Sequence, residues 1–351
     1  MKLSVCETCG QLLQFEHAAC RRCGARLGFI PGAMVLTALL DREDGTVAPK
    51  SRPDEAWRRC VNAEAVGCNW LLPEDAADPR CAACRLNRNL ADMNPPGNRA
   101  KWAALECAKR RLLYALMRFG LPIPSRAQGA PNGLAFDFLA DSDPAAPVLT
   151  GHDEGLITLN IAEANPAERE KRRLELGEPY RTLLGHLRHE VGHYYWDVLV
   201  RDGGRIEACR AVFGDESVDY QEALNVHYQS GAPAGWEADF VSAYATMHPW
   251  EDFAETWTHY LHIIDTLDTA ASFGMAVDPG EVDDPSLSTE IGFDPYRARN
   301  FDRLVGAWLP LTIAVNSLNR SMGQPDLYPF ALTPATIEKV RFIHLLVHGR
   351  A

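Results

Sequence analysis

The stretch His189-Glu190-Val191-Gly192-His193 constrains the fold of this chain more than any other. An α-helix repeats every 3.6 residues, so a helix through this stretch places His189 and His193 side by side, one turn apart. Two imidazoles at that spacing can bind one zinc ion, and Glu190 between them can reach a water molecule beside the metal. The alternative is an ordinary amphipathic helix with histidines on its surface.

The residues around this stretch favour a helix from Tyr180 to Val200. The segment contains no proline, and its apolar side chains recur close to the helical period. Gly192 is a poor helix former, so its place beside His193 indicates that another part of the chain approaches the backbone closely there. His186 lies one turn before His189, but no carboxylate stands between the two, so we expect His186 to be exposed or hydrogen bonded.

A zinc site of this kind needs a third protein ligand, and Glu251 or Glu255 can supply it. The two glutamates lie one turn apart on a second predicted helix, whose apolar stripe indicates burial. Two carboxylates buried together repel each other unless a cation is near, which fits one ligand and one supporting carboxylate. A solvated acidic face is the alternative, and His248 and His259 are rival ligands.

The pattern His189-Glu190-x-x-His193 followed by Glu251-x-x-x-Glu255 resembles the gluzincin metallopeptidases. With Tyr244 seven residues before Glu251, it is similar to the peptidase domain of anthrax lethal factor, although only over these active-site segments. The resemblance implies that Glu251 is the third zinc ligand and that Glu255 accepts a hydrogen bond from a ligating histidine. It also implies that Tyr244 donates to the oxyanion of the transition state.

Nearly the whole chain resembles bacterial zinc-binding metallopeptidases that carry an N-terminal zinc ribbon. The resemblance includes Gly67-Cys68-Asn69-Trp70-Leu71 and Cys84-Arg85-Leu86-Asn87. It implies an α+β fold in which a small β-rich double zinc-ribbon module precedes a zincin-like, mostly helical metallopeptidase domain with a small sheet. It implies peptide-bond hydrolysis with Glu190 as general base, and it does not identify the substrate.

Eight of the ten cysteines lie in the first 84 residues and form two sets of four. The first set consists of two Cys-x-x-Cys-Gly sequences, and we expect it to hold one structural zinc ion: Cys6, Cys9, Cys20 and Cys23. The second set has only one Cys-x-x-Cys pair, and the family resemblance strengthens its assignment to a second structural zinc ion: Cys60, Cys68, Cys81 and Cys84. We expect Cys107 and Cys209 to be buried, inert thiols.

Disulfide bonds are the alternative to metal for these cysteines. The chain runs from Met1 into Cys6 without the apolar core of a signal peptide, so we expect a cytoplasmic protein with reduced thiols. No apolar run approaches the ~20 residues that a membrane span requires. Metal therefore explains the cysteines better, and with the histidine site we expect three zinc ions per chain.

The net charge of −12 is unevenly distributed. Residues 1–99 hold 13 Lys and Arg against 12 Asp and Glu, whereas residues 100–351 hold 22 against 35. Such a chain lacks the basic footprint that phosphate binding requires, so we expect no nucleic-acid partner. Nucleic acid would have to use local arginines: Arg21, Arg22, Arg58 and Arg59.

The clearest candidate linker is Asn94-Pro95-Pro96-Gly97-Asn98, because prolines and glycines interrupt helices and strands and are common in linkers. It separates an expected zinc-ribbon module, residues 1–93, from an expected metallopeptidase domain, residues 99–351. In the first, residues 35–40 and the turn at Asp44-Gly45 predict a hairpin. In the second we expect helices and strands in this order: helix 99–119, strands 133–139 and 155–160, then helices 299–317 and 334–347, the last capped by Thr333.

By analogy with zincins, the strand at residues 155–160 would be a sheet edge that pairs with an extended peptide substrate. The predicted function is hydrolysis of a peptide or protein substrate by a zinc-activated water, with a protein partner on the ribbon as a further expectation. The alternative is a non-catalytic adaptor, in which the ribbon binds a partner or nucleic acid and the zincin domain only holds metal.

Overall fold

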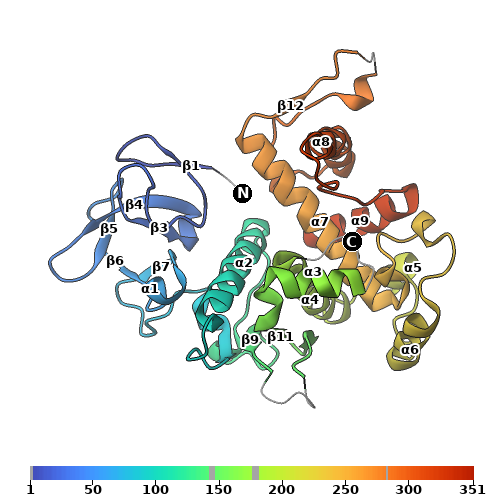
Figure 1. Ribbon diagram of the computed structural model, residues 1–351, viewed down its shortest axis with the longest axis horizontal. Coiled ribbons are helices and arrows are strands. Elements are labelled where there is room, and N and C mark those ends of the chain that lie inside the picture. Colours follow the sequence, from blue (N-terminus) through green and yellow to red (C-terminus); the bar gives the residue numbers. More distant parts are fainter. Residues whose placement is uncertain (1–2, 142–146, 176–181, 282–283) are drawn as a thin grey trace. The chain divides into compact units, whose positions relative to one another are not determined.

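The computed structural model describes residues 3–141, 147–175, 182–281 and 284–351, and it contains two compact units (Figure 1). The units are Met1–Arg172 and Arg173–Ala351. Residues 94–98 lie inside the first unit, and the division into domains at this linker stays a prediction. Within the described residues, no helix combines the length and apolar character needed to cross a membrane.

The first unit starts with two short paired strands and a five-stranded antiparallel sheet in the order β3-β4-β5-β6-β7. The strands are β1 (Ser4–Val5), β2 (Leu12–Leu13), β3 (Leu27–Ile30), β4 (Val35–Asp41), β5 (Val47–Pro49), β6 (Trp57–Arg59) and β7 (Leu71–Pro73). Asp44 and Gly45 connect β4 to β5: Asp44 Oδ1 accepts from Thr46 N at 2.8 Å, and Gly45 has the positive φ of 82° that the turn requires. The predicted hairpin is confirmed.

The rest of this unit combines a long helix with a four-stranded sheet in the order β10-β11-β9-β8. The elements are α1 (Ala63–Val66), β8 (Asn87–Leu90), α2 (Asn98–Phe119), β9 (Ala135–Leu139), β10 (Gly151–Asp153), β11 (Leu156–Asn160) and the first part of α3 (Pro166–Glu175), which ends in the second unit. β9 runs parallel to both β8 and β11, whereas β10 and β11 form an antiparallel hairpin. The strands expected at residues 133–139 and 155–160 and the helix at residues 99–119 are confirmed.

The expectation that residues 155–160 form a sheet edge is wrong. β11 lies between β9 and β10, so both of its sides are already paired over Leu156–Thr158. The physical reason is a tight turn at Glu154 and Gly155, where φ values of 43° and 86° fold the preceding residues back as β10. A peptide substrate therefore cannot pair along β11 as the zincin analogy suggested.

The second unit is mostly helical, with one two-stranded ribbon. Its elements are α4 (Leu183–Tyr195), α5 (Ile206–Phe213), α6 (Tyr220–Ser230), α7 (Pro249–Ser272), β12 (Ala276–Val277), β13 (Thr289–Glu290), α8 (Phe301–Ser321) and α9 (Pro334–Val347). Tyr180 lies outside the described residues, and α4 starts after Thr182, whose Oγ1 accepts from Gly185 N. The helix then continues as a π-helical segment, Trp196–Arg201, so the predicted helix is confirmed over its described part. Thr333 caps α9 as expected.

Helices α4 and α7 pack directly against each other in the second unit (Figure 1). A Cβ on Gly192 would lie 3.0 Å from Ala254 Cα, which confirms the close approach inferred from this glycine. One turn further along α4, the ring of Tyr195 stacks on Trp257 with centroids 5.0 Å apart. This contact brings the histidine-bearing face of α4 opposite the start of α7. The predicted fold class, a β-rich module followed by a mostly helical α+β domain, is confirmed.

Candidate metal centres

Side chains from α4 and α7 converge on one point in the second unit: His189, His193 and Glu251. The two histidine Nε2 atoms are 3.1 Å apart, and Glu251 Oε2 lies 2.9 Å from the first and 3.4 Å from the second. Ligands about 2.1 Å from a tetrahedral zinc ion are about 3.4 Å from one another. The three ligand atoms therefore have the separations of a zinc site, and three protein ligands leave a fourth position open.

The surroundings of these three atoms favour a positive charge between them. Glu251 Oε2 is buried and accepts no hydrogen bond from a described residue. Burial lowers the pKa of His189, but the neighbouring carboxylates Glu251 and Glu255 outweigh this effect and raise the pKa well above its ordinary value. Burial raises the pKa of Glu251, but the imidazoles of His193 and His189 outweigh this effect and lower the pKa well below its ordinary value. The donor set and the spacing of the three ligand atoms fit a zinc ion.

Glu255 orients one of the imidazoles. Its Oε1 lies 2.7 Å from His189 Nδ1, and its Oε2 accepts from Ser242 Oγ at 2.7 Å. Ser242 Oγ in turn accepts from Ala245 N at 3.1 Å. A carboxylate that accepts a hydrogen bond from Nδ1–H keeps the proton on Nδ1 and directs the Nε2 lone pair of His189 toward His193 and Glu251, as in many histidine–metal sites.

Glu190 and Tyr244, the predicted base and oxyanion donor, both lie beside the histidine pair. Glu190 is buried on α4 between the two histidines; burial raises its pKa, which the neighbouring imidazoles partly oppose. The ring of Tyr244 lies 6.0 Å from that of His189, centroid to centroid. Burial raises the pKa of Tyr244, so its hydroxyl stays protonated and can donate a hydrogen bond. The structure thus brings both predicted residues to the histidine pair.

The three rival histidines lie outside the group of metal ligands found among the described residues: His186, His248 and His259. His248 is the N-cap of α7, where its Nδ1 accepts from Trp250 N at 3.1 Å. His259 Nδ1 lies 2.7 Å from the hydroxyl of Tyr328. Both are buried and committed to these hydrogen bonds, which explains why neither reaches the site.

The sequence reasoning missed three residues at this site: Tyr220, Ser242 and Trp250. The hydroxyl of Tyr220 donates to Glu251 Oε1 at 2.9 Å, and the ring of Trp250 lies 3.7 Å from that of His193. Trp250 could have been found because it adjoins Glu251. Tyr220 carried no such signal, because its helix, α6, has neither motif spacing nor a buried stripe.

The first cysteine set forms a compact group in the first unit. The Sγ atoms of Cys6 and Cys23 are 3.7 Å apart, and those of Cys9 and Cys20 are 3.6 Å apart. Four thiolates about 2.3 Å from a tetrahedral zinc ion have edges of about 3.8 Å, which these distances match. Each Cys-x-x-Cys turn ends on a glycine with positive φ, Gly10 and Gly24, whose N–H bonds back to the first cysteine's carbonyl.

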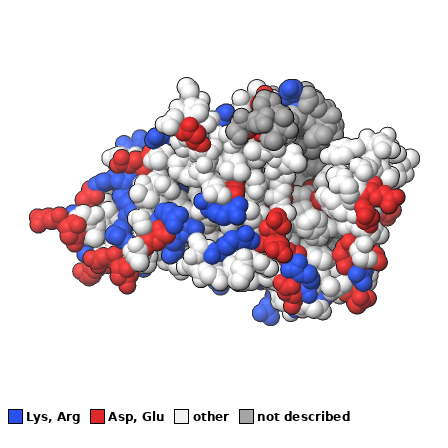
Figure 2. All heavy atoms as spheres, turned by 90° about the horizontal axis from the view of Figure 1, so that it is seen from below, with Lys and Arg blue, Asp and Glu red and all other residues white. Residues whose placement is uncertain are grey.

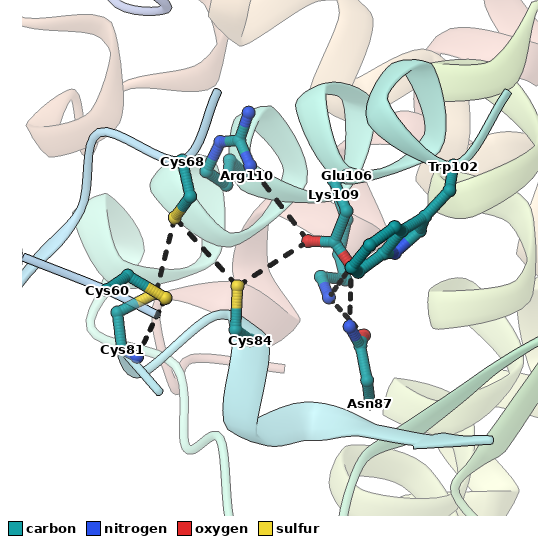
Figure 3. Close-up of polar contacts among 9 residues, drawn as sticks. All are labelled: Cys60, Cys68, Cys81, Cys84, Asn87, Trp102, Glu106, Lys109 and Arg110. Carbon is teal, nitrogen blue, oxygen red and sulfur yellow. Dashed lines mark hydrogen bonds and ion pairs between the residues drawn. The ribbon is translucent and has the colours of Figure 1, made fainter. Parts of the chain in front are cut away.

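The second cysteine set is fully buried, and Figure 3 shows its four thiols converging beside helix α2. Cys68 Sγ lies 3.6 Å from Cys81 Sγ and 3.9 Å from Cys84 Sγ, again the edges of a zinc tetrahedron. Helix α2 adds three buried charged residues next to Cys84: Glu106, Lys109 and Arg110. The two cations offset the negative charge that four thiolates and a carboxylate bring into the interior.

All ten cysteines are free, so the disulfide alternative is wrong. The sulfur separations near 3.6–3.9 Å are far longer than a disulfide bond, about 2.05 Å. Burial raises the pKa of Cys209 to about 12, as expected for an inert thiol. Cys107 is only half-buried, so the expectation that it is a buried thiol is wrong. Its partial burial on α2 still raises the pKa of its thiol.

The chain combines an N-terminal zinc ribbon with a domain that matches a family of zinc-binding metallopeptidases. Residues 98–346 match the family model described as "Putative zinc-binding metallo-peptidase", and residues 3–95 match a zinc-ribbon domain. The chain therefore belongs to this metallopeptidase family, as the sequence resemblance implied. Zinc binding is supported by both family descriptions and by the two four-cysteine sites.

Full-length relatives occur in mycobacteria. Uncharacterized proteins of Mycobacterium tuberculosis (strains H37Rv and CDC 1551) and Mycobacterium bovis are each 44% identical to this chain over 344 residues. The match covers 97% of this chain and 94% of each relative. No solved structure matches the chain.

Proposed function

We propose that this protein is a gluzincin-like, zinc-dependent metallopeptidase that hydrolyses peptide bonds. His189, His193 and Glu251 would hold the catalytic zinc ion. The observation that carries the proposal is the buried Glu190 carboxylate on the same helix as two imidazoles whose Nε2 atoms, with Glu251 Oε2, have zinc-site spacing. A purely structural site has four protein ligands and needs no such base.

A bound zinc ion supplies Lewis-acid chemistry, because it polarises a substrate carbonyl and makes a water molecule more acidic. Glu190 takes the proton of the attacking water and delivers it to the leaving amine, and burial that raises its pKa suits this exchange. Tyr244 donates to the developing oxyanion, a contact worth about 3 kcal/mol where such donors have been removed. Glu255 keeps His189 in the ligating tautomer.

We propose three zinc ions per chain, one exchangeable and two structural. Each cysteine set offers four thiolates, which close a tetrahedral site, whereas the histidine site offers three ligands and stays open. The reduced thiols fit a cytoplasmic location.

The substrate is proposed to be a peptide or protein rather than nucleic acid. On the face shown in Figure 2, Lys and Arg side chains are interspersed with Asp and Glu side chains, and large areas carry neither. Phosphate backbones bind to continuous basic surfaces, and this face carries a mixture of both charges instead. In the adaptor alternative the domain holds metal without cleaving peptides, and a peptidase assay distinguishes this alternative from the peptidase proposal.

The test compares wild type, Glu190→Gln and the control Glu207→Gln on an unbiased peptide library, with zinc content measured in parallel. We expect Glu190→Gln to keep its zinc and lose about 10²–10⁴-fold in turnover, the usual contribution of acid–base catalysis. Glu207 is exposed on α5, so its variant should match wild type. If Glu190→Gln cleaves as fast as wild type, the proposed base is wrong. Wild type with three zinc ions and no hydrolysis would favour the adaptor.

A further inference from the structure

The two oxygens of Glu251 have different partners. Oε2 lies 2.9 Å and 3.4 Å from the two histidine Nε2 atoms, whereas Oε1 accepts a hydrogen bond from the Tyr220 hydroxyl at 2.9 Å. A carboxylate can bind a metal ion through one oxygen or through both. With Oε1 held by a phenol, only Oε2 is presented to the histidines, which preserves an open fourth position.

Tyr220 packs its ring against His248 and Trp250, with ring centroids 5.3 Å and 6.1 Å apart. It is the first residue of α6, a helix that buries none of its side chains. Asp219 fixes the start of this helix, because its Oδ1 accepts from Glu222 N at 2.7 Å. From this position the Tyr220 hydroxyl makes a hydrogen bond to Glu251 in the metal group.

A second contact ties the start of α6 to the start of α7. His248 Nδ1 accepts from Trp250 N, so the ring proton lies on Nε2, which donates to the carbonyl of Val218 at 3.1 Å. Val218 is two residues before Tyr220, and His248 is three residues before Glu251. The buried imidazole thus fixes the distance between the segment that carries the phenol and the turn that carries the carboxylate.

We propose that Tyr220 is a positioning residue that holds Glu251 in a single-oxygen orientation toward the metal, with His248 fixing the backbone before Tyr220. This inference rests on the proposed zinc site at His189, His193 and Glu251. Removing the hydrogen-bond partner of a metal ligand typically costs about 10–100-fold in metal affinity.

The test uses the full chain with Tyr220→Phe, which removes one hydroxyl and keeps the ring. Tyr228→Phe is the matched control, since Tyr228 lies on the same helix and is 66% exposed. Zinc is stripped from the exchangeable site and titrated back against a chromophoric chelator, with the thiolate sites still filled. We expect Tyr220→Phe to raise the zinc Kd about 10–100-fold and Tyr228→Phe to leave it unchanged. Cobalt in the same site should show an altered visible spectrum in Tyr220→Phe only, which a purely structural role would not produce.

The outcomes separate this inference from the peptidase proposal. If Tyr220→Phe binds zinc with wild-type affinity and an unaltered cobalt spectrum, the inference is overturned and the metal site stands. If His193→Ala loses no metal relative to wild type, the metal site is wrong and the inference falls with it. Weaker zinc binding by Tyr220→Phe in a chain that hydrolyses no peptide would support the inference and refute the peptidase.

Discussion

Gly192→Ala tests the contact on which the geometry of the metal site depends. The new Cβ would lie 3.0 Å from Ala254 Cα and 3.3 Å from Ala254 Cβ and O. Carbon atoms pack best at about 3.5–4.0 Å. The nearest atom belongs to the backbone and cannot rotate away, so α4 and α7 must move apart by roughly half an ångström.

The expected magnitude follows from two opposing terms. Alanine is favoured over glycine in a helix interior by about 1 kcal/mol. Overpacking a close contact costs about 1–3 kcal/mol. The free energy of unfolding should therefore stay level or fall by up to about 2 kcal/mol. Zinc sites tolerate distance errors of only about 0.2 Å, so a shift between His193 and the helix of Glu251 should weaken zinc binding about tenfold or more.

Gly306→Ala is the matched control, because this helical glycine in α8 has open space where a Cβ would be. It should gain up to about 1 kcal/mol in stability and leave zinc binding unchanged. Urea unfolding gives the stability, and chelator competition gives the zinc affinity of each variant. If Gly192→Ala gains as much stability as Gly306→Ala and binds zinc equally well, the account of the α4–α7 contact is refuted.

Three further changes test other parts of the chain. Cys60→Ser should lower the zinc content by one ion per chain, measured by elemental analysis, and reduce the Tm, because a buried four-thiolate site would lose a ligand. Lys339→Met should destabilise the protein by about 3–5 kcal/mol in urea unfolding, since it leaves buried Asp252 without its cation; adding Asp252→Asn should restore most of the loss. Burial lowers the pKa of His259 to about 4, below its ordinary 6.5. As the pH falls, His259 therefore binds a proton in the unfolded chain before it does so in the folded chain. Stability present above pH 6.5 should therefore fall by about 3 kcal/mol as the pH drops toward 4, and His259→Gln should reduce this fall in pH-dependent urea unfolding.

Features set by spacing along one element could be predicted from the sequence. His189 and His193 are neighbours because a helix repeats every 3.6 residues, and no distant contact is needed to bring them together. The same holds for Cys6 and Cys9, because the N–H of Gly10 closes their turn by donating to the carbonyl of Cys6. Glu251 lies on a different helix, so its approach to the histidines depends on the packing of α4 on α7, which Gly192 and the family resemblance indicated.

Features that depend on how distant segments meet could not be predicted. Nothing in the composition of α6 indicates that Tyr220 reaches Glu251, because the contact depends on the path of the chain between α5 and α7. The edge position expected for β11 failed for a similar reason, since a turn with a left-handed Glu154 added β10 beside it. A non-glycine residue with positive φ is unusual enough that the sequence gives no warning of it.

The start of α7 carries three acidic side chains within five residues: Glu251 and Asp252 are buried, and Glu255 is half-buried. A buried carboxylate is unfavourable unless it is paired. Asp252 pairs with Lys339 Nζ at 2.6 Å, and Glu255 bonds to His189 and Ser242. Glu251 has the Tyr220 hydroxyl on one oxygen and no described donor on the other. The negative charge on Glu251 Oε2 therefore remains to be balanced. A cation between this oxygen and the imidazoles would stabilise the start of α7 and would also supply the chemistry proposed for the site.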